Sequence, residues 1–132
     1  MPPTHLYTEL AARHEHYCPM STLGLRIGWA ASRLPDAAAL EAVYLSRTCA
    51  VDGIALALDL QAIEVEERGV HCLQLHAGGQ GGWRIELREE TLRLAASYRD
   101  LPGEAEREAL LERLRQAEES DLLVVQRLEV EE

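Results

Sequence analysis

Apolar residues recur at helical spacing in four segments of the chain. The segments 3–13 and 21–33 each carry a stripe of leucine, isoleucine or alanine on one side, which predicts two N-terminal helices. Residues 55–60 alternate small residues with leucines and predict a short buried helix. Residues 104–119 place leucines inward and glutamate–arginine pairs outward, which predicts a C-terminal helix with a solvated face.

Elsewhere the apolar period changes to two, as is typical of strands. Residues 42–46 predict a first strand, and the alternation in 63–66, 70–76 and 83–88 predicts an antiparallel meander. Residues 121–130 predict a closing strand. The expected fold is therefore α+β: N-terminal helices packed on an antiparallel sheet or meander, with a C-terminal helix and a closing strand.

Two segments of the chain have more than one interpretation from the sequence. Residues 91–98 fit a strand and a helix equally well. The glycine-rich run at residues 77–82 lies between two predicted strands and has neither a following helix nor a lysine, so it predicts a hairpin loop rather than a phosphate-binding loop.

Length and composition narrow the class of protein. A chain of 132 residues is the size of one domain, taken here as residues 1–132. No apolar run approaches the roughly 20 residues that span a bilayer, and the N-terminus lacks the pattern of a secretion signal, so we expect a cytoplasmic protein without a membrane segment. The net charge of −10 repels phosphate backbones, which argues against nucleic-acid binding.

Candidate chemistry begins where the first predicted helix ends. His14, His16 and Cys18 fall within five residues, and Pro19 closes the run. Imidazole and thiolate suit zinc and similar metals. Residues at i, i+2 and i+4 converge from a loop or strand but not from one helical face. The alternative is a loop with partly exposed histidines and a buried cysteine.

Cys18 is expected on the threshold of the second helix, with Ser21 or Thr22 capping that helix. Cys49 likewise follows a predicted strand and precedes a predicted helix. A cysteine at a helix start has its thiolate favoured by the helix dipole. Asp52 is a candidate ligand or an acid/base beside Cys49, or only a first-turn carboxylate that favours the dipole.

Other small residues and thiols have more ordinary interpretations. Three cysteines in a chain without an export signal do not indicate a disulfide framework. Cys72 shares its face of a predicted strand with His76 and is expected in the core rather than at a metal. Gly24 and Gly28, four apart in a predicted helix, indicate that another backbone passes very close.

Two separated motifs carry a family resemblance: His14-Glu15-His16-Tyr17-Cys18-Pro19, and Cys49-Ala50-Val51-Asp52-Gly53-Ile54. They resemble the FmdE family, named after a component of formylmethanofuran dehydrogenase. Members typically show His-x-His-x-Cys-Pro-Gly and then Cys-x-Val-Asp-Ala-Ile. The chain departs from this pattern at Met20, where glycine is usual, and at Gly53, where alanine is usual.

The resemblance implies an α+β homodimer with a metal, zinc or another divalent transition metal, in the histidine/cysteine region. On this basis His14, His16, Cys18 and Cys49 are the expected metal ligands. Cys18, Cys49 and Asp52 are the candidate catalytic residues, with Asp52 orienting a ligand or transferring a proton.

The implied function is metal binding, with a small molecule or cofactor as a further ligand, in a molybdenum or tungsten enzyme setting. The alternatives are a non-catalytic accessory module and a thiol redox protein that uses Cys18 and Cys49. The pattern does not decide between turnover and binding alone. In the metal and thiol-pair hypotheses alike, both thiols should face one cavity.

Overall fold

The fold is that of a computed structural model, which describes residues 1–14, 18–35, 40–76 and 81–128, without the side chain of His14. The elements in chain order are α1 (Thr4–His14), α2 (Pro19–Ser32), β1 (Glu41–Tyr44), α3 (Ala50–Ala57), β2 (Glu64–Val65), β3 (Cys72–His76), β4 (Gly82–Leu87), α4 (Glu89–Ala96), the 3₁₀ turn η2 (Ser97–Asp100), α5 (Glu104–Gln116), α6 (Glu119–Leu122) and β5 (Leu123–Leu128). The α+β class is confirmed.

Five strands form one sheet in the order β2-β1-β3-β4-β5. The pairs β1–β3, β3–β4 and β4–β5 are antiparallel, as the alternating pattern predicts. The prediction was wrong for β2, which pairs with β1 in parallel instead of joining a meander with β3. The β3–β4 pairing confirms the predicted hairpin, whose loop residues 77–80 lie outside the described residues.

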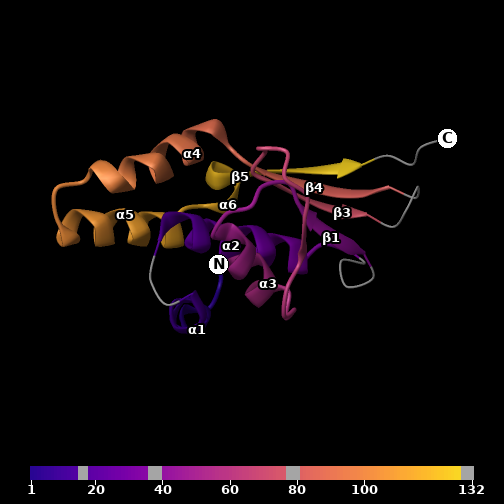
Figure 1. The fold of residues 1–132 in the computed structure, drawn as a ribbon, viewed down its shortest axis with the longest axis horizontal. Helices are drawn as coiled ribbons and strands as arrows, with labels where there is room; N and C mark the ends of the chain where they lie inside the picture. The colour runs from indigo at the N-terminus through magenta and orange to yellow at the C-terminus, as the bar shows by residue number, and fades with distance from the viewer. Residues whose placement is uncertain (15–17, 36–39, 77–80, 129–132) are drawn as a thin grey trace.

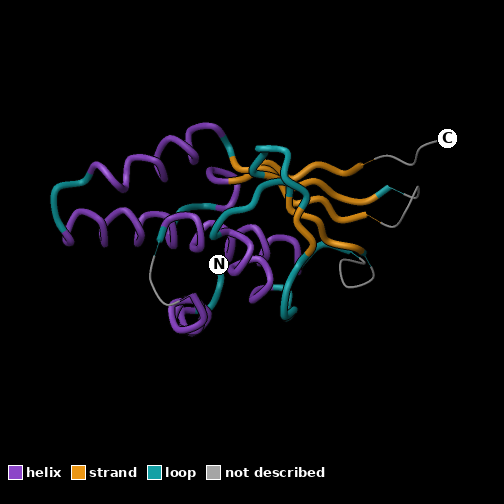
Figure 2. Tube along the Cα trace, in the orientation of Figure 1, coloured by secondary structure: helices purple, strands orange, loops and turns teal. Residues whose placement is uncertain are grey.

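The main core lies between one face of the sheet and the helices. Tyr44, Leu73 and Ile85 contribute from the strands, and Leu23 and Ile54 pack against them from α2 and α3. The opposite face carries a smaller cluster. Figure 1 shows α2 and α3 lying against the sheet, while Figure 2 shows α4 and α5 extending away from it.

A buried arginine joins α2 to the end of α5. Arg26 is only 2% exposed, and its Nη1 donates to the carbonyl oxygens of Leu114, at 3.2 Å, and Arg115, at 2.8 Å. Because the last carbonyls of a helix have no partner within it, Arg26 satisfies two groups at the C-terminal end of α5.

The undecided segment 91–98 is mostly helical, since α4 runs from Glu89 to Ala96. Two glutamates lie in its first turn, where they favour the helix dipole. The hydroxyl of Thr91 also donates to the carbonyl oxygen of Leu122 at 2.9 Å, a contact across 31 residues. A contact between residues so far apart in the chain cannot be predicted from the local sequence pattern of residues 91–98.

None of the described helices is long and apolar enough to cross a membrane.

Candidate metal and thiol site

The site is positioned by two helices that pack unusually close. A Cβ built on Gly24 would lie 2.0 Å from the carbonyl oxygen of Ala50, and one on Gly53 would lie 2.3 Å from that of Ser21. Further along, a Cβ on Gly28 would meet the Ile54 backbone at 2.8 Å. Side chains at these positions would therefore collide with backbone.

These contacts also fix the direction of the helix pair. Gly24 meets Ala50 and Gly28 meets Ile54, so α2 and α3 run parallel and their N-termini lie together. The predicted close approach of another backbone is confirmed, and that backbone belongs to the same chain. The close packing of Gly24 and Gly28 is thus explained without a second protomer.

Cys18 is the residue that caps α2. Its extended backbone precedes Pro19 at the first helical position, and its Sγ accepts a hydrogen bond from the backbone N–H of Ser21 at 3.3 Å. The Ser21 hydroxyl donates back to the Cys18 carbonyl at 3.1 Å. The expectation that Ser21 or Thr22 caps the helix is therefore wrong, because the helix starts two residues before Ser21, at Pro19.

Cys49 lies at the start of α3, which begins at Ala50 instead of the predicted residue 55. Thr48, one residue earlier, takes the capping role: its Oγ1 accepts from the N–H of Ala50 at 3.2 Å. The Cys49 side chain makes no capping hydrogen bond. Its thiol is instead directed to Cys18, with which it forms a side-chain hydrogen bond.

Three acidic side chains, the thiols of Cys18 and Cys49 and the carboxylate of Asp52, lie close enough to affect one another. Burial raises the pKa of the Cys49 thiol to about 11, and the Cys18 thiol and then the Asp52 charge add to the effect. The helix start alone was expected to favour the Cys49 thiolate. In the metal-free protein this expectation is wrong, because burial and two neighbouring acids outweigh the dipole.

The structure therefore brings Cys18, Cys49 and Asp52 together and does not test the histidines. The His14 side chain and the whole of His16 lie outside the described residues. Within the described part of the chain, no three His, Cys, Asp or Glu side chains form a metal-binding group. Cys72 is buried, as predicted, in the small cluster with Val43 and Leu45.

Sequence reasoning gave Ser21 the wrong role, as a cap instead of a support of Cys18, and missed Thr48 beside Cys49. Each was visible as a signal: Ser21 is three residues after Cys18, the usual distance between a cap and the N–H that it accepts. Thr48 directly precedes Cys49, where a hydroxyl can cap the first turn.

Comparison with known proteins agrees with this arrangement. The family described as "FmdE, Molybdenum formylmethanofuran dehydrogenase operon" matches residues 13–126, which include both cysteine motifs. The chain belongs to the FmdE family. No curated protein matches it.

A solved structure has the same fold as this FmdE-family chain. It is a tungsten formylmethanofuran dehydrogenase FmdE-like protein from Syntrophus aciditrophicus, with a TM-score of 0.70 and 21% sequence identity. The alignment covers 96% of this chain and 72% of the other. At this identity the likeness shows the fold alone.

Proposed function

We propose that this FmdE-family domain binds zinc or another divalent transition metal through Cys18 and Cys49, with His14 and His16 as further ligands. The observation that carries the proposal is the hydrogen-bonded contact between the two thiols at the paired N-termini of α2 and α3. Two neighbouring sulfur donors match the preference of zinc. The histidines are two and four residues before Cys18, within reach of the same site along the chain.

The electrostatics of the group also favour a cation. Cys18 and Asp52 both oppose a negative charge on Cys49, so the metal-free site retains a proton. A divalent cation would replace that proton, because metal ligands must be deprotonated. The N–H of Ser21 already donates to Cys18 Sγ and would continue to hold that sulfur in position.

A bound metal with an open position would supply Lewis acidity toward a small anionic or thiol ligand, or a cofactor. Asp52 then has the role of orienting that ligand or transferring a proton. We place this function in the cytoplasm and in the setting of molybdenum or tungsten enzymes; the family description, which names a molybdenum formylmethanofuran dehydrogenase operon, supports the molybdenum setting. A non-catalytic accessory module would use the same residues for binding alone.

Elemental analysis of protein purified without a metal-affinity tag tests the metal site. We expect Cys18→Ser and Cys49→Ser each to weaken metal binding by at least about 100-fold, more than is usual for outer-shell changes. Cys72→Ala is the matched control, since it removes a thiol from the opposite face of the sheet and should leave metal content unchanged. Full metal occupancy in both serine variants would refute the site.

A second candidate is a reversible thiol pair, which the Cys18–Cys49 hydrogen bond also supports. The two thiols would lose two protons and two electrons to a small disulfide, which would be reduced to two thiols. Metal bound in stoichiometric amount to the reduced protein favours the first candidate. A metal-free pair that closes to a disulfide with oxidised glutathione favours the second.

We also propose a homodimer, supported by the family resemblance and by strand β5 at the edge of the sheet. Val125 on this strand is 37% exposed, and an edge strand offers unpaired backbone groups to a second chain. Gly24 and Gly28, whose close-packing surface could have contacted a second protomer, do not support the proposal, because α3 of the same chain occupies that surface. A monomer mass by light scattering at all concentrations would refute it.

A further inference from the structure

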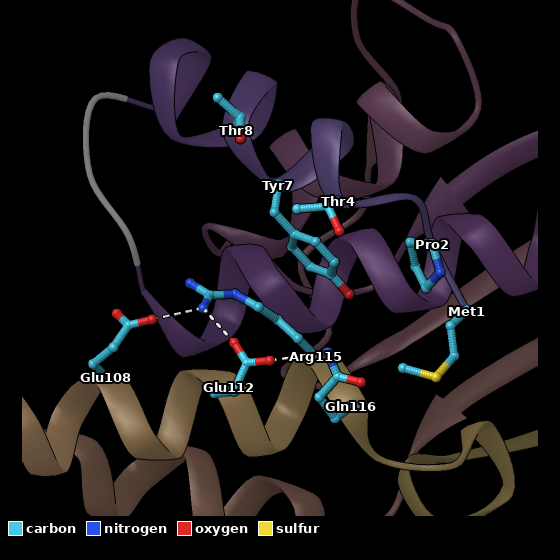
Figure 3. Close-up of a pocket in the computed structure, with 9 residues that line it drawn as sticks. All are labelled: Met1, Pro2, Thr4, Tyr7, Thr8, Glu108, Glu112, Arg115 and Gln116. Atoms are coloured by element: carbon cyan, nitrogen blue, oxygen red, sulfur yellow. Dashed lines mark hydrogen bonds and ion pairs between the residues drawn. The ribbon is translucent and has the colours of Figure 1, made fainter.

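A cavity of about 290 Å³ lies between the start of α1 and the end of α5. Thr4 and Tyr7 line it from α1, and Glu112 and Arg115 line it from α5 (Figure 3). Cys18 and Cys49 do not line this cavity. It is therefore a separate feature from the thiol pair.

The hydroxyl of Tyr7 points into this space (Figure 3). The side chain is only 8% exposed, yet Tyr7 Oη has no hydrogen-bond partner of normal geometry among the described residues. Arg26 lowers the pKa of the phenol through its charge and as a side-chain donor to the phenol oxygen, and its Nη1 also donates to carbonyls at the end of α5. Burial has the larger effect and raises the pKa of Tyr7, so the hydroxyl keeps its proton and is a donor.

A buried hydroxyl whose proton has no acceptor is unfavourable. The usual remedies are an ordered water or a ligand. One water occupies roughly 30 Å³ of liquid, so the cavity has room for a larger molecule. Because the Tyr7 hydroxyl is a donor, this molecule must present a hydrogen-bond acceptor to it.

The surroundings of the hydroxyl favour an anionic acceptor. Helix α1 begins at Thr4 on the cavity wall, and its first turn carries no acidic side chain, so its positive end is uncompensated there. The Arg115 guanidinium lies 5.7 Å from the centre of the Tyr7 ring, and its side chain is only 13% exposed. The helix start and Arg115 therefore supply the positive charge of the lining, and Glu108 and Glu112, which also line the cavity, oppose it.

Two carboxylates limit how much negative charge the cavity accepts. Glu108 and Glu112 bind Arg115 Nη1 at 2.7 and 3.1 Å, and their side chains are 60% and 53% exposed. They hold the guanidinium in place from the solvent side. They would also repel a dianion such as phosphate more strongly than a singly charged group.

We propose that this cavity binds a small molecule with a single carboxylate, which accepts a hydrogen bond from Tyr7 Oη beside Arg115 and the start of α1. The site is independent of the metal site and does not need it. The carboxylate completes the only hydrogen bond that the Tyr7 hydroxyl can donate. An occupied cavity differs from an empty one at Tyr7, because the hydroxyl has an acceptor only when the carboxylate is bound.

Acetate is the probe, titrated into the full chain while backbone amide shifts and melting temperature are followed. We expect saturable shifts in residues 4–8 and a higher melting temperature, with phosphate at equal ionic strength giving a smaller effect. Tyr7→Phe should weaken acetate binding by about tenfold or more, as for a lost hydrogen bond to a charged group. Tyr98→Phe, a half-buried tyrosine outside the cavity, is the control and should bind as the wild type does.

The unliganded Tyr7→Phe protein separates a binding hydroxyl from a structural one. Because the variant removes a buried donor that has no acceptor, its melting temperature without acetate should equal or exceed that of the wild type. A lower melting temperature would show that Arg26 or another group needs the hydroxyl, and the proposal would fail. Equal acetate binding by Tyr7→Phe, equal effects of phosphate, or shifts that never saturate would each overturn it as well.

Discussion

Cys49 and Cys72 share a raised pKa and its main cause, burial, but differ in the groups that act on them besides burial. Burial raises the pKa of both thiols to about 11. Around Cys72 the packing neighbours Val43 and Leu45 are apolar, and the charges of Arg84 and Glu86 shift its pKa in opposite directions. Around Cys49 the Cys18 thiol and the Asp52 carboxylate add to the shift.

This difference separates a core thiol from a site thiol. The pKa of Cys72 is raised mainly by burial, and the positive charge of Arg84 nearby would not favour a cation beside this thiol. The pKa of Cys49 is raised by burial first and then by the Cys18 thiol and the Asp52 charge, whose effects a cation would offset. A perturbed pKa indicates a functional site when its causes are specific groups, and not when burial alone explains it.

The largest effect is expected from separating the helices that hold Cys18 and Cys49. Gly24→Ala would gain up to about 1 kcal/mol in helix propensity. It would also place a Cβ 2.0 Å from the Ala50 carbonyl oxygen, and backbone there cannot move without displacing α3. We expect a net loss of about 3 kcal/mol or more in the free energy of unfolding, measured by denaturant titration, together with loss of bound metal.

Gly103→Ala is the control for this substitution. A Cβ at Gly103 meets only the Glu106 carboxylate, a flexible group that can rotate away, so we expect a change within about 1 kcal/mol. Wild-type stability and metal content in Gly24→Ala would show that close packing of α2 on α3 does not position the cysteines.

Periodicity predicts the elements whose pattern is set by the core. The stripes of α1 and α5 and the alternation of β3 and β4 give the right element type, because each of these elements buries one side more than the other. The stripe of α2 also predicts a helix, although that helix is buried on nearly all sides. The predicted start of α3 is five residues late. Its apolar run is visible in the sequence, whereas its first turn depends on the Thr48 hydroxyl and on Gly53 fitting against α2.

The site is predictable in outline through its two motifs. Cys18 and Cys49 are 31 residues apart, and this spacing alone does not predict that they are in contact. The expectation that they meet comes from the family resemblance. The capping order at Cys18 was wrong, because serine is a commoner cap than cysteine and the sequence favours Ser21. His14 and His16 stay predictions as metal ligands.

An intermediate effect is expected in thiol reactivity. After chelation of metal, iodoacetamide should label Cys18 and Cys49, which are half-buried, at least about tenfold faster than Cys72, which is 0% exposed and needs local opening to react. Zinc should protect the first two and leave Cys72 unaffected. Mass spectrometry of the labelled peptides measures all three rates, with unfolded protein as the control in which they become similar.

Labelling of all three cysteines at one rate, indifferent to zinc, would contradict the division into site and core thiols. Protection of Cys18 alone would leave Cys49 outside the metal site while keeping the rest of the comparison.

The smallest effect concerns the charge beside Cys49 in metal-free protein. Asp52→Asn removes a negative charge that disfavours the thiolate, so the pKa of Cys49 should fall, by less than about one unit because Asp52 is the least of the groups that raise it. Since the folded pKa of about 11 lies above the unfolded value of about 8.5, Cys49 stabilises the fold fully below pH 8.5. That contribution is lost as pH rises toward 11. Asp52→Asn should therefore reduce the loss of stability over this range.

Thiolate absorbance of single-cysteine variants measures the two pKa values, and the pKa of Cys72 should not move, since its charged neighbours are Arg84 and Glu86. An equal fall in both thiols, or none in Cys49, would show that Asp52 has no specific part in the site.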